Sequence, residues 1–208
     1  MNSLVPEELN NICFAAGFTR RGKAFFRVAG DGVFQVIKLK YERVFRADLI
    51  CIGLFSMYDQ LLPQWFTATG CIPRYSVVEC AIQATMPLVA APPMSMQIDL
   101  LQSKVMLWLD SIDTQKKLSI AVGKVDRRWN DGLKFGPYLA CGEANHAKKV
   151  AREILAQHAT QLEQDFVWFD LLAMLDRADP AEIGSYLKAN YARNMEYAKF
   201  CIKTPKQA

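Results

Sequence analysis

Basic and aromatic side chains alternate along one stretch near the start of the chain, and this pattern could bind nucleic acid. Residues 17–46 contain eight Lys or Arg and two acidic residues, whereas the net charge of all 208 residues is +4. Proteins bind single strands with cations on the phosphates and rings stacked on the bases. The predicted nucleic-acid-binding residues are Lys23, Phe25, Arg27, Phe34, Lys38 and Lys40. A solvated sheet face, with its rings covered by a helix, would give the same pattern.

A second group of cations and rings lies in residues 126–143, where no helical or strand periodicity is evident. Irregular stretches of this length are often functional, and Arg and aromatic residues are enriched at protein interfaces. The predicted partner-binding residues are Arg127, Arg128, Trp129, Lys134, Phe135 and Tyr138. The alternative is a connector whose rings pack against the helices.

Residues that commonly carry out catalysis are few and scattered. The chain has two histidines, His146 and His158, and its six cysteines form no Cys-x-x-Cys pair, so no metal-ligand spacing is evident. Cys141 and His146 form the one pair that could act as thiolate and base. Gly30-Asp31-Gly32 is interpreted as a turn, because Asp31 would repel a phosphate. We expect no catalytic residue, no metal ion and no cofactor.

Two runs rich in β-forming residues flank Asp31 and Gly32, which predicts a hairpin with a two-residue type I′ turn. The register follows by counting outward from this turn. One face is then expected to carry Val28 with Gln35, Phe26 with Ile37 and Ala24 with Leu39, and the other Arg27 with Val36, Phe25 with Lys38 and Lys23 with Lys40. The run 49–57 is apolar on both faces, which predicts a central third strand.

Helical spacing predicts a helix that begins near Pro6 and ends at Gly17, and several helices after Met94. A further strand is expected at 75–82. The fold class is α+β: a small antiparallel sheet, formed by the N-terminal hairpin and the central strand, packs against helices, and the C-terminal third is helical. We expect a single domain over 1–208, with a helix and sheet in 1–90 and mainly helices in 94–202.

The last helix has a clear predicted start. Asp179 is a suitable N-cap, Pro180 occupies the first helical position, and Glu182 stands where a capping-box partner would.

One pattern resembles a known family. It reads Gly17-Phe18-x-x-x-Gly22-x-x-Phe25-x-Arg27, and it is followed by an apolar strand containing Gln35 and then a second apolar strand. This is similar to the bacterial family called "domain of unknown function 4304", over about residues 5–60. The resemblance implies a bacterial α+β protein of the cytosol, and it implies no activity and no catalytic residues.

The composition is typical of a globular protein, with 51% hydrophobic and 22% charged residues. We expect neither a signal peptide nor a membrane span, since prolines interrupt the longest uncharged stretch, 80–98. These features favour a cytoplasmic, non-catalytic module that binds another protein. The first alternative is a nucleic-acid-binding protein that uses the basic and aromatic hairpin face, and the second is a hydrolytic enzyme whose site is not evident.

Overall fold

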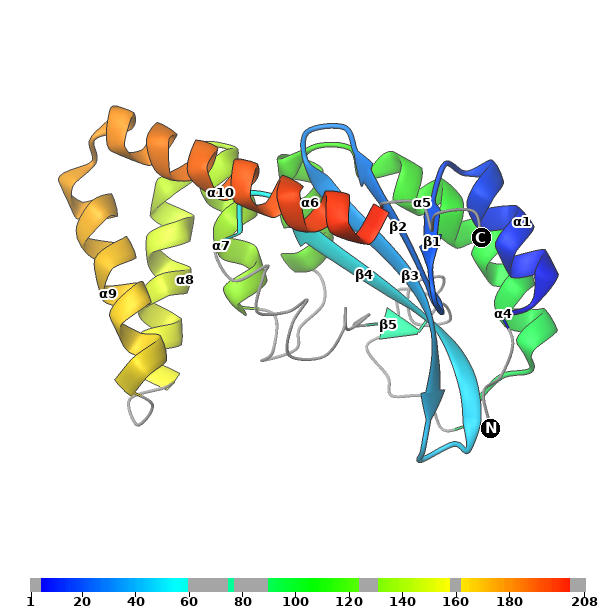
Figure 1. Ribbon diagram of the computed structural model, residues 1–208. Helices are drawn as coiled ribbons and strands as arrows, with labels where there is room; N and C mark the ends of the chain where they lie inside the picture. The colour runs from blue at the N-terminus through cyan, green and yellow to red at the C-terminus, as the bar shows by residue number, and fades with distance from the viewer. Residues whose placement is uncertain (1–4, 60–74, 77–89, 124–130, 158–161, 203–208) are drawn as a thin grey trace.

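A five-stranded sheet lies between helices, and a separate group of helices extends from one end of it (Figure 1). The structure is a computed structural model that describes residues 5–59, 75–76, 90–123, 131–157 and 162–202. The strands are β1 (Thr19–Arg21), β2 (Ala24–Ala29), β3 (Val33–Glu42), β4 (Ala47–Ser56) and β5 (Tyr75–Ser76). The helices are α1 (Glu7–Ala15), α4 (Met94–Leu100), the π-helical η1 (Leu101–Val105), α5 (Met106–Ser111), α6 (Gln115–Gly123), α7 (Asp131–Ala140), α8 (Ala144–Gln157), α9 (Leu162–Arg177) and α10 (Pro180–Ile202). The predicted α+β class is therefore confirmed.

The first helix ends as predicted, at Gly17. Its φ is +78°, a conformation that glycine adopts without steric cost. The Gly17 N–H donates to the Phe14 carbonyl, and the Phe18 N–H donates to the Cys13 carbonyl, each over 3.0 Å. These two bonds form a Schellman motif, which turns the chain directly into β1.

The strands follow the order β1-β2-β3-β4-β5, and all neighbours are antiparallel. β4 pairs with β3 on one side and with β5 on the other, so the run predicted as a central strand does lie inside the sheet. It is the fourth strand rather than the third, because the short β1 precedes the hairpin. The strand expected at 75–82 begins as β5, and its remaining residues lie outside the described part of the chain.

The predicted register of the β2–β3 hairpin was wrong by one residue. Ala29 pairs with Val33 and Arg27 pairs with Gln35, so the turn contains three residues. A type I′ turn needs positive φ at Asp31, but the positive values occur at Gly30 (+39°) and Gly32 (+68°). A shift of one residue on one strand moves that strand's side chains to the opposite face.

Helices cover both faces of the sheet (Figure 1). On one face, Phe25 contacts Phe14 of α1 edge-on, with ring centroids 6.0 Å apart, and Gln35 donates to the Leu109 carbonyl of α5 over 2.8 Å. α10 crosses the other face, where Ala198 is buried in the sheet's hydrophobic core. The fold therefore has helical layers on both sides of β2 and β3.

A second hydrophobic core lies among α7, α8, α9 and the start of α10. Its centre includes Phe135 and Trp168, whose rings meet edge-on at 5.3 Å. Ile183 of α10 packs on this core, whereas Met195, later in the same helix, packs on the sheet core. α10 thus joins the two cores.

Residues 131–140 form helix α7, so the prediction of an irregular stretch over 126–143 was wrong for this part. Pro137 lies inside the helix, where it removes a backbone hydrogen bond. Burial of Phe135 and Leu139 compensates for this cost. Gly136 lets α7 approach β4, because a Cβ at this position would stand 3.0 Å from the Asp59 nitrogen.

The start of α10 is partly as predicted. Asp179 caps the helix through its Oδ1, which accepts from the Ala181 N–H over 2.9 Å, and Pro180 is the first helical residue. Glu182 does not complete a capping box as expected. It accepts from the Arg177 Nε over 2.9 Å, because the end of α9 brings the guanidinium beside it.

Candidate functional site

The six predicted nucleic-acid-binding residues do not share one face. Phe25 and Arg27 point toward α1 and α5, whereas Phe34 and Lys38 occupy the opposite side of the sheet. Both phenylalanine rings are 0% exposed. Lys23 lies in the β1–β2 turn, where its carbonyl accepts from Leu39. The prediction of one basic and aromatic face was therefore wrong, for the reason of register given above.

Arg27 belongs to an internal network. Its Nε donates to Gln35 Oε1 over 2.7 Å, its Nη1 donates to the Ala16 carbonyl over 2.7 Å, and its Nη2 contacts Asp110 Oδ1 at 2.5 Å. The guanidinium carbon lies 4.5 Å from the centroid of Phe18. Nη1 and Nη2 thus tie the sheet to α1 and α5, while Nε joins β2 to β3, so Arg27 has a structural role.

Three of the six predicted partner-binding residues lie in α7: Lys134, Phe135 and Tyr138. Arg127, Arg128 and Trp129 lie outside the described residues. Phe135 is buried against Trp168 in the second core, and half-buried Tyr138 stacks on the His146 ring with centroids 5.2 Å apart. Lys134 is also half-buried. The two rings of α7 therefore pack in the second core and on α8, and they do not form one exposed surface.

The Cys141–His146 pair is not arranged as a nucleophile and base. The Cys141 thiol donates to the Tyr138 carbonyl over 3.4 Å, and His146 Nδ1 contacts Glu143 Oε2 at 3.0 Å. Burial raises the pKa of the Cys141 thiol above its ordinary value, which disfavours the thiolate. Among the described residues, no three metal-binding side chains form a group that could hold an ion.

Polar groups gather around the β2–β3 turn. The Asp31 N–H donates to the Asp113 carbonyl over 2.8 Å, and the Asp31 carbonyl accepts from Gln115 Nε2 over 2.6 Å. The Tyr58 hydroxyl donates to Asp31 Oδ1 over 3.2 Å, and its ring packs on Tyr191. Burial, reinforced by the Asp31 charge, raises the pKa of Tyr58 to about 12. These contacts fix the turn against α6 and α10.

A neighbouring joint connects α10 to the end of β4. The fully buried Asn194 amide donates to the Met57 carbonyl over 2.8 Å and to the Asp59 carbonyl over 2.7 Å. Asn190 donates to the Tyr58 carbonyl over 3.3 Å. The pKa of nearby Tyr186 is raised by burial and then by the Asp59 charge. This cluster acts as an internal connection between the sheet and the helices.

The exposed feature of the sheet is a two-stranded projection, residues 40–48, which we call the β3–β4 arm. Pairing with β2 ends at Ala24 and Lys38, whereas β3 and β4 continue through Glu42 and Ala47. Residues 43–46 form the turn, and Arg46 has a φ of +51°. The arm extends past the end of β2, and its tip lies beyond the other labelled helices and strands (Figure 1).

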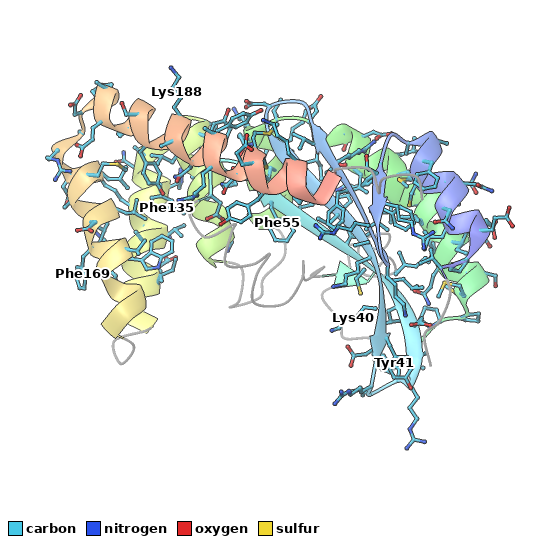
Figure 2. All side chains as sticks on the ribbon, in the orientation of Figure 1. Lys40, Tyr41, Phe55, Phe135, Phe169 and Lys188 are labelled. Carbon is cyan, nitrogen blue, oxygen red and sulfur yellow. The ribbon has the colours of Figure 1, made fainter. Side chains whose placement is uncertain are left out.

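The exposed side chains of the arm are basic, aromatic or apolar: Lys40, Tyr41, Arg43, Val44 and Arg46. Val44 at the tip is 82% exposed and Tyr41 is 54% exposed. Lys40 Nζ contacts Glu42 Oε2 at 3.2 Å, and Figure 2 shows Lys40 and Tyr41 at the base of the arm. Arg43 and Arg46 are exposed and form no ion pair with any other described residue. The arm therefore offers both charge and apolar surface.

Gln97 of α4 holds the arm at its base. Its Oε1 accepts from the Ile50 N–H over 2.7 Å, and its Nε2 donates to the carbonyls of Asp48 (3.1 Å) and Pro92 (3.0 Å). Gln97 is only 1% exposed. Its amide thus hydrogen-bonds to backbone groups on the edge of β4 that faces away from β3. These bonds fix the direction in which the arm leaves the sheet.

Most of the positive charge of the hairpin region gathers at this end of the sheet. Within residues 19–24 and 38–48 of these strands, the cations are Arg20, Arg21, Lys23, Lys38, Lys40, Arg43 and Arg46, and the acidic residues are Glu42 and Asp48. Asp31 and Arg27 lie toward the opposite end of β2 and β3. Arg43, Arg46, Tyr41 and Val44 are not among the site residues predicted from the sequence. The sequence feature that could have indicated this site is the length of the β3–β4 hairpin, whose strands continue past the end of β2.

No helix in the described ranges combines the length and the apolar character that a membrane span requires. Comparisons with protein families, with characterised proteins and with solved structures found no match to this chain.

Proposed function

We propose that this chain is a non-catalytic binding module that contacts an anionic macromolecule through the β3–β4 arm. One observation carries the proposal: residues 19–24 and 38–48 hold seven cations and two acidic residues at the end of the sheet where a ribbon with exposed Tyr41 and Val44 begins. A local excess of positive charge steers anionic partners and speeds their association. Tyr and Arg side chains also contribute strongly to the affinity of interfaces.

The internal polar groups support a binding role over a catalytic one. Arg27, Gln35 and Asn194 make hydrogen bonds that join elements of the fold. Burial raises the pKa of Cys13 to about 12 and also raises that of Cys141, so neither thiol is activated as a nucleophile.

Retention on immobilised heparin, a polyanion, tests the proposal. We expect the wild type to be retained at low salt and an Arg43→Glu/Arg46→Glu variant to elute at much lower salt. The matched control is Lys104→Glu/Lys188→Glu, which changes net charge equally at exposed lysines away from the arm (Lys188 is labelled in Figure 2). Equal shifts for both variants, or a wild type that passes through at low salt, would refute the proposal.

The comparison is valid only if both variants fold. All four positions are exposed, so each double variant should unfold within about 0.5 kcal/mol of the wild type. Thermal unfolding followed by circular dichroism checks this before the binding measurement.

A further inference from the structure

We infer that the anionic partner is double-stranded DNA and that the β3–β4 arm enters its major groove. This inference rests on the proposed function and adds the class of partner to it. It is drawn from the size of the arm, the position of its charges and the burial of the nearby rings.

The dimensions of the arm suit the groove. Three residue pairs lie beyond Leu39 and Ile50: Lys40 with Leu49, Tyr41 with Asp48 and Glu42 with Ala47. At about 3.4 Å a residue, these pairs and the turn reach about 10 Å or more, while the major groove is about 8.5 Å deep. Its width of about 12 Å admits a two-stranded β-ribbon.

The charges suit phosphates on either side of such an insertion. Arg43 and Arg46 flank the tip, and Lys40 lies on β3 three residues before Arg43. These cations can contact the backbone, while exposed Val44 reaches base edges, where the thymine methyl group offers an apolar contact.

The burial pattern favours a duplex over a single strand. Stacking of successive bases requires a series of exposed rings. Phe25 and Phe34 are 0% exposed, and within the arm Tyr41 is the one exposed ring. Double-stranded RNA is also disfavoured, because its major groove is too deep and narrow for side chains to read.

Fluorescence anisotropy with DNA duplex, RNA duplex and single-stranded DNA probes of equal length and sequence tests the inference. We expect the DNA duplex to bind at least tenfold more tightly than the other two probes. Contacts by Lys40, Arg43 and Arg46 predict a slope of log K against log salt of about −3. Arg43→Ala/Arg46→Ala should reduce the magnitude of this slope by about 2.

Val44→Ala separates groove contact from backbone contact. It should weaken DNA binding several-fold and leave the salt slope unchanged, because it removes no charge. Lys188→Ala, at an exposed lysine of α10, is the control for a cation outside the arm.

Two results would overturn the inference and leave the proposed function intact: retention on heparin without binding of any nucleic acid, which would point to an acidic protein, and equal affinity for all three probes. A wild type that fails to bind heparin as well would overturn both.

Discussion

The carbonyl oxygen of Asp113 lies where a side chain on Gly30 would begin: a Cβ built at Gly30 would stand 1.9 Å from it. The same carbonyl accepts from the Asp31 N–H over 2.8 Å. The turn between β2 and β3 is therefore closed against the chain that enters α6, and this contact requires glycine.

Gly30→Ala should lower the free energy of unfolding by roughly 2–4 kcal/mol, because the new methyl group collides with backbone and strains a φ of +39°. Urea unfolding measures the loss. The control is Gly184→Ala in α10, where nothing lies within 4 Å of the added Cβ. This change should stabilise the helix by about 0.5–1 kcal/mol. A neutral Gly30→Ala variant would contradict the packing described for the turn.

Arg27→Lys should destabilise the protein by about 1–3 kcal/mol although it conserves the charge. A lysine cannot reproduce the fork that contacts Gln35, Ala16 and Asp110, so the part-buried acceptors of Gln35 and Ala16 lose their donors. Thermal unfolding is the measurement, and exposed Arg46→Lys is the control, with an expected change below about 0.5 kcal/mol. Equal effects at the two positions would argue against the internal network.

Phe135→Ala and Phe169→Ala form a matched pair within the helical region (Figure 2). Phe135 is 1% exposed in the second core, so its truncation should cost about 3–5 kcal/mol. Phe169 on α9 is 59% exposed and should change stability by less than about 1 kcal/mol. Chemical denaturation of both variants tests this, and a small effect at Phe135 would show that the second core is not formed as described.

The raised pKa of Tyr58 predicts a loss of stability at high pH. An unfolded tyrosine ionises near pH 10, whereas folded Tyr58 stays protonated until about pH 12. Between these values the unfolded state has released a proton that the folded state keeps, so stability falls as pH rises through this window. Tyr58→Phe should decline less steeply over the same window, as measured by urea unfolding at several pH values.

Asp31→Asn provides a second measurement of the same contact. It removes the negative charge beside the hydroxyl, so the pKa of Tyr58 should fall toward its ordinary value in an ultraviolet titration. An unchanged titration would show that burial alone, the larger cause, accounts for the shift.

Local signals identified most of the elements. The glycine at 17, the Asp-Pro pair at 179 and 180 and the apolar run of β4 each correspond to an observed boundary or position. These signals act over a few residues, so they can be read without knowledge of the fold.

The failures have a different origin, because long-range packing decided them. The β2–β3 turn has three residues, and it packs against Asp113, which is distant in sequence. Helix α7 forms despite Pro137, because Phe135 is buried in the second core. The candidate site depended on this register, so Phe25 and Phe34 were assigned to a surface that they do not reach. The projection of the arm could be inferred only by comparing strand lengths, since exposure depends on where β2 ends.

The amide of Asn194 reaches the carbonyl of Met57 across 137 positions of sequence. Contacts between residues so far apart in sequence form late, because closing the long loop between them costs conformational entropy before the contact can stabilise the chain. The strands of the sheet are neighbours in sequence, so their pairing requires only short loops. We therefore expect the β1–β4 meander to assemble first and α10 to dock afterwards. The unfolding rate should then be set by the release of this helix, and Asn194→Ala should accelerate unfolding much more than it slows folding.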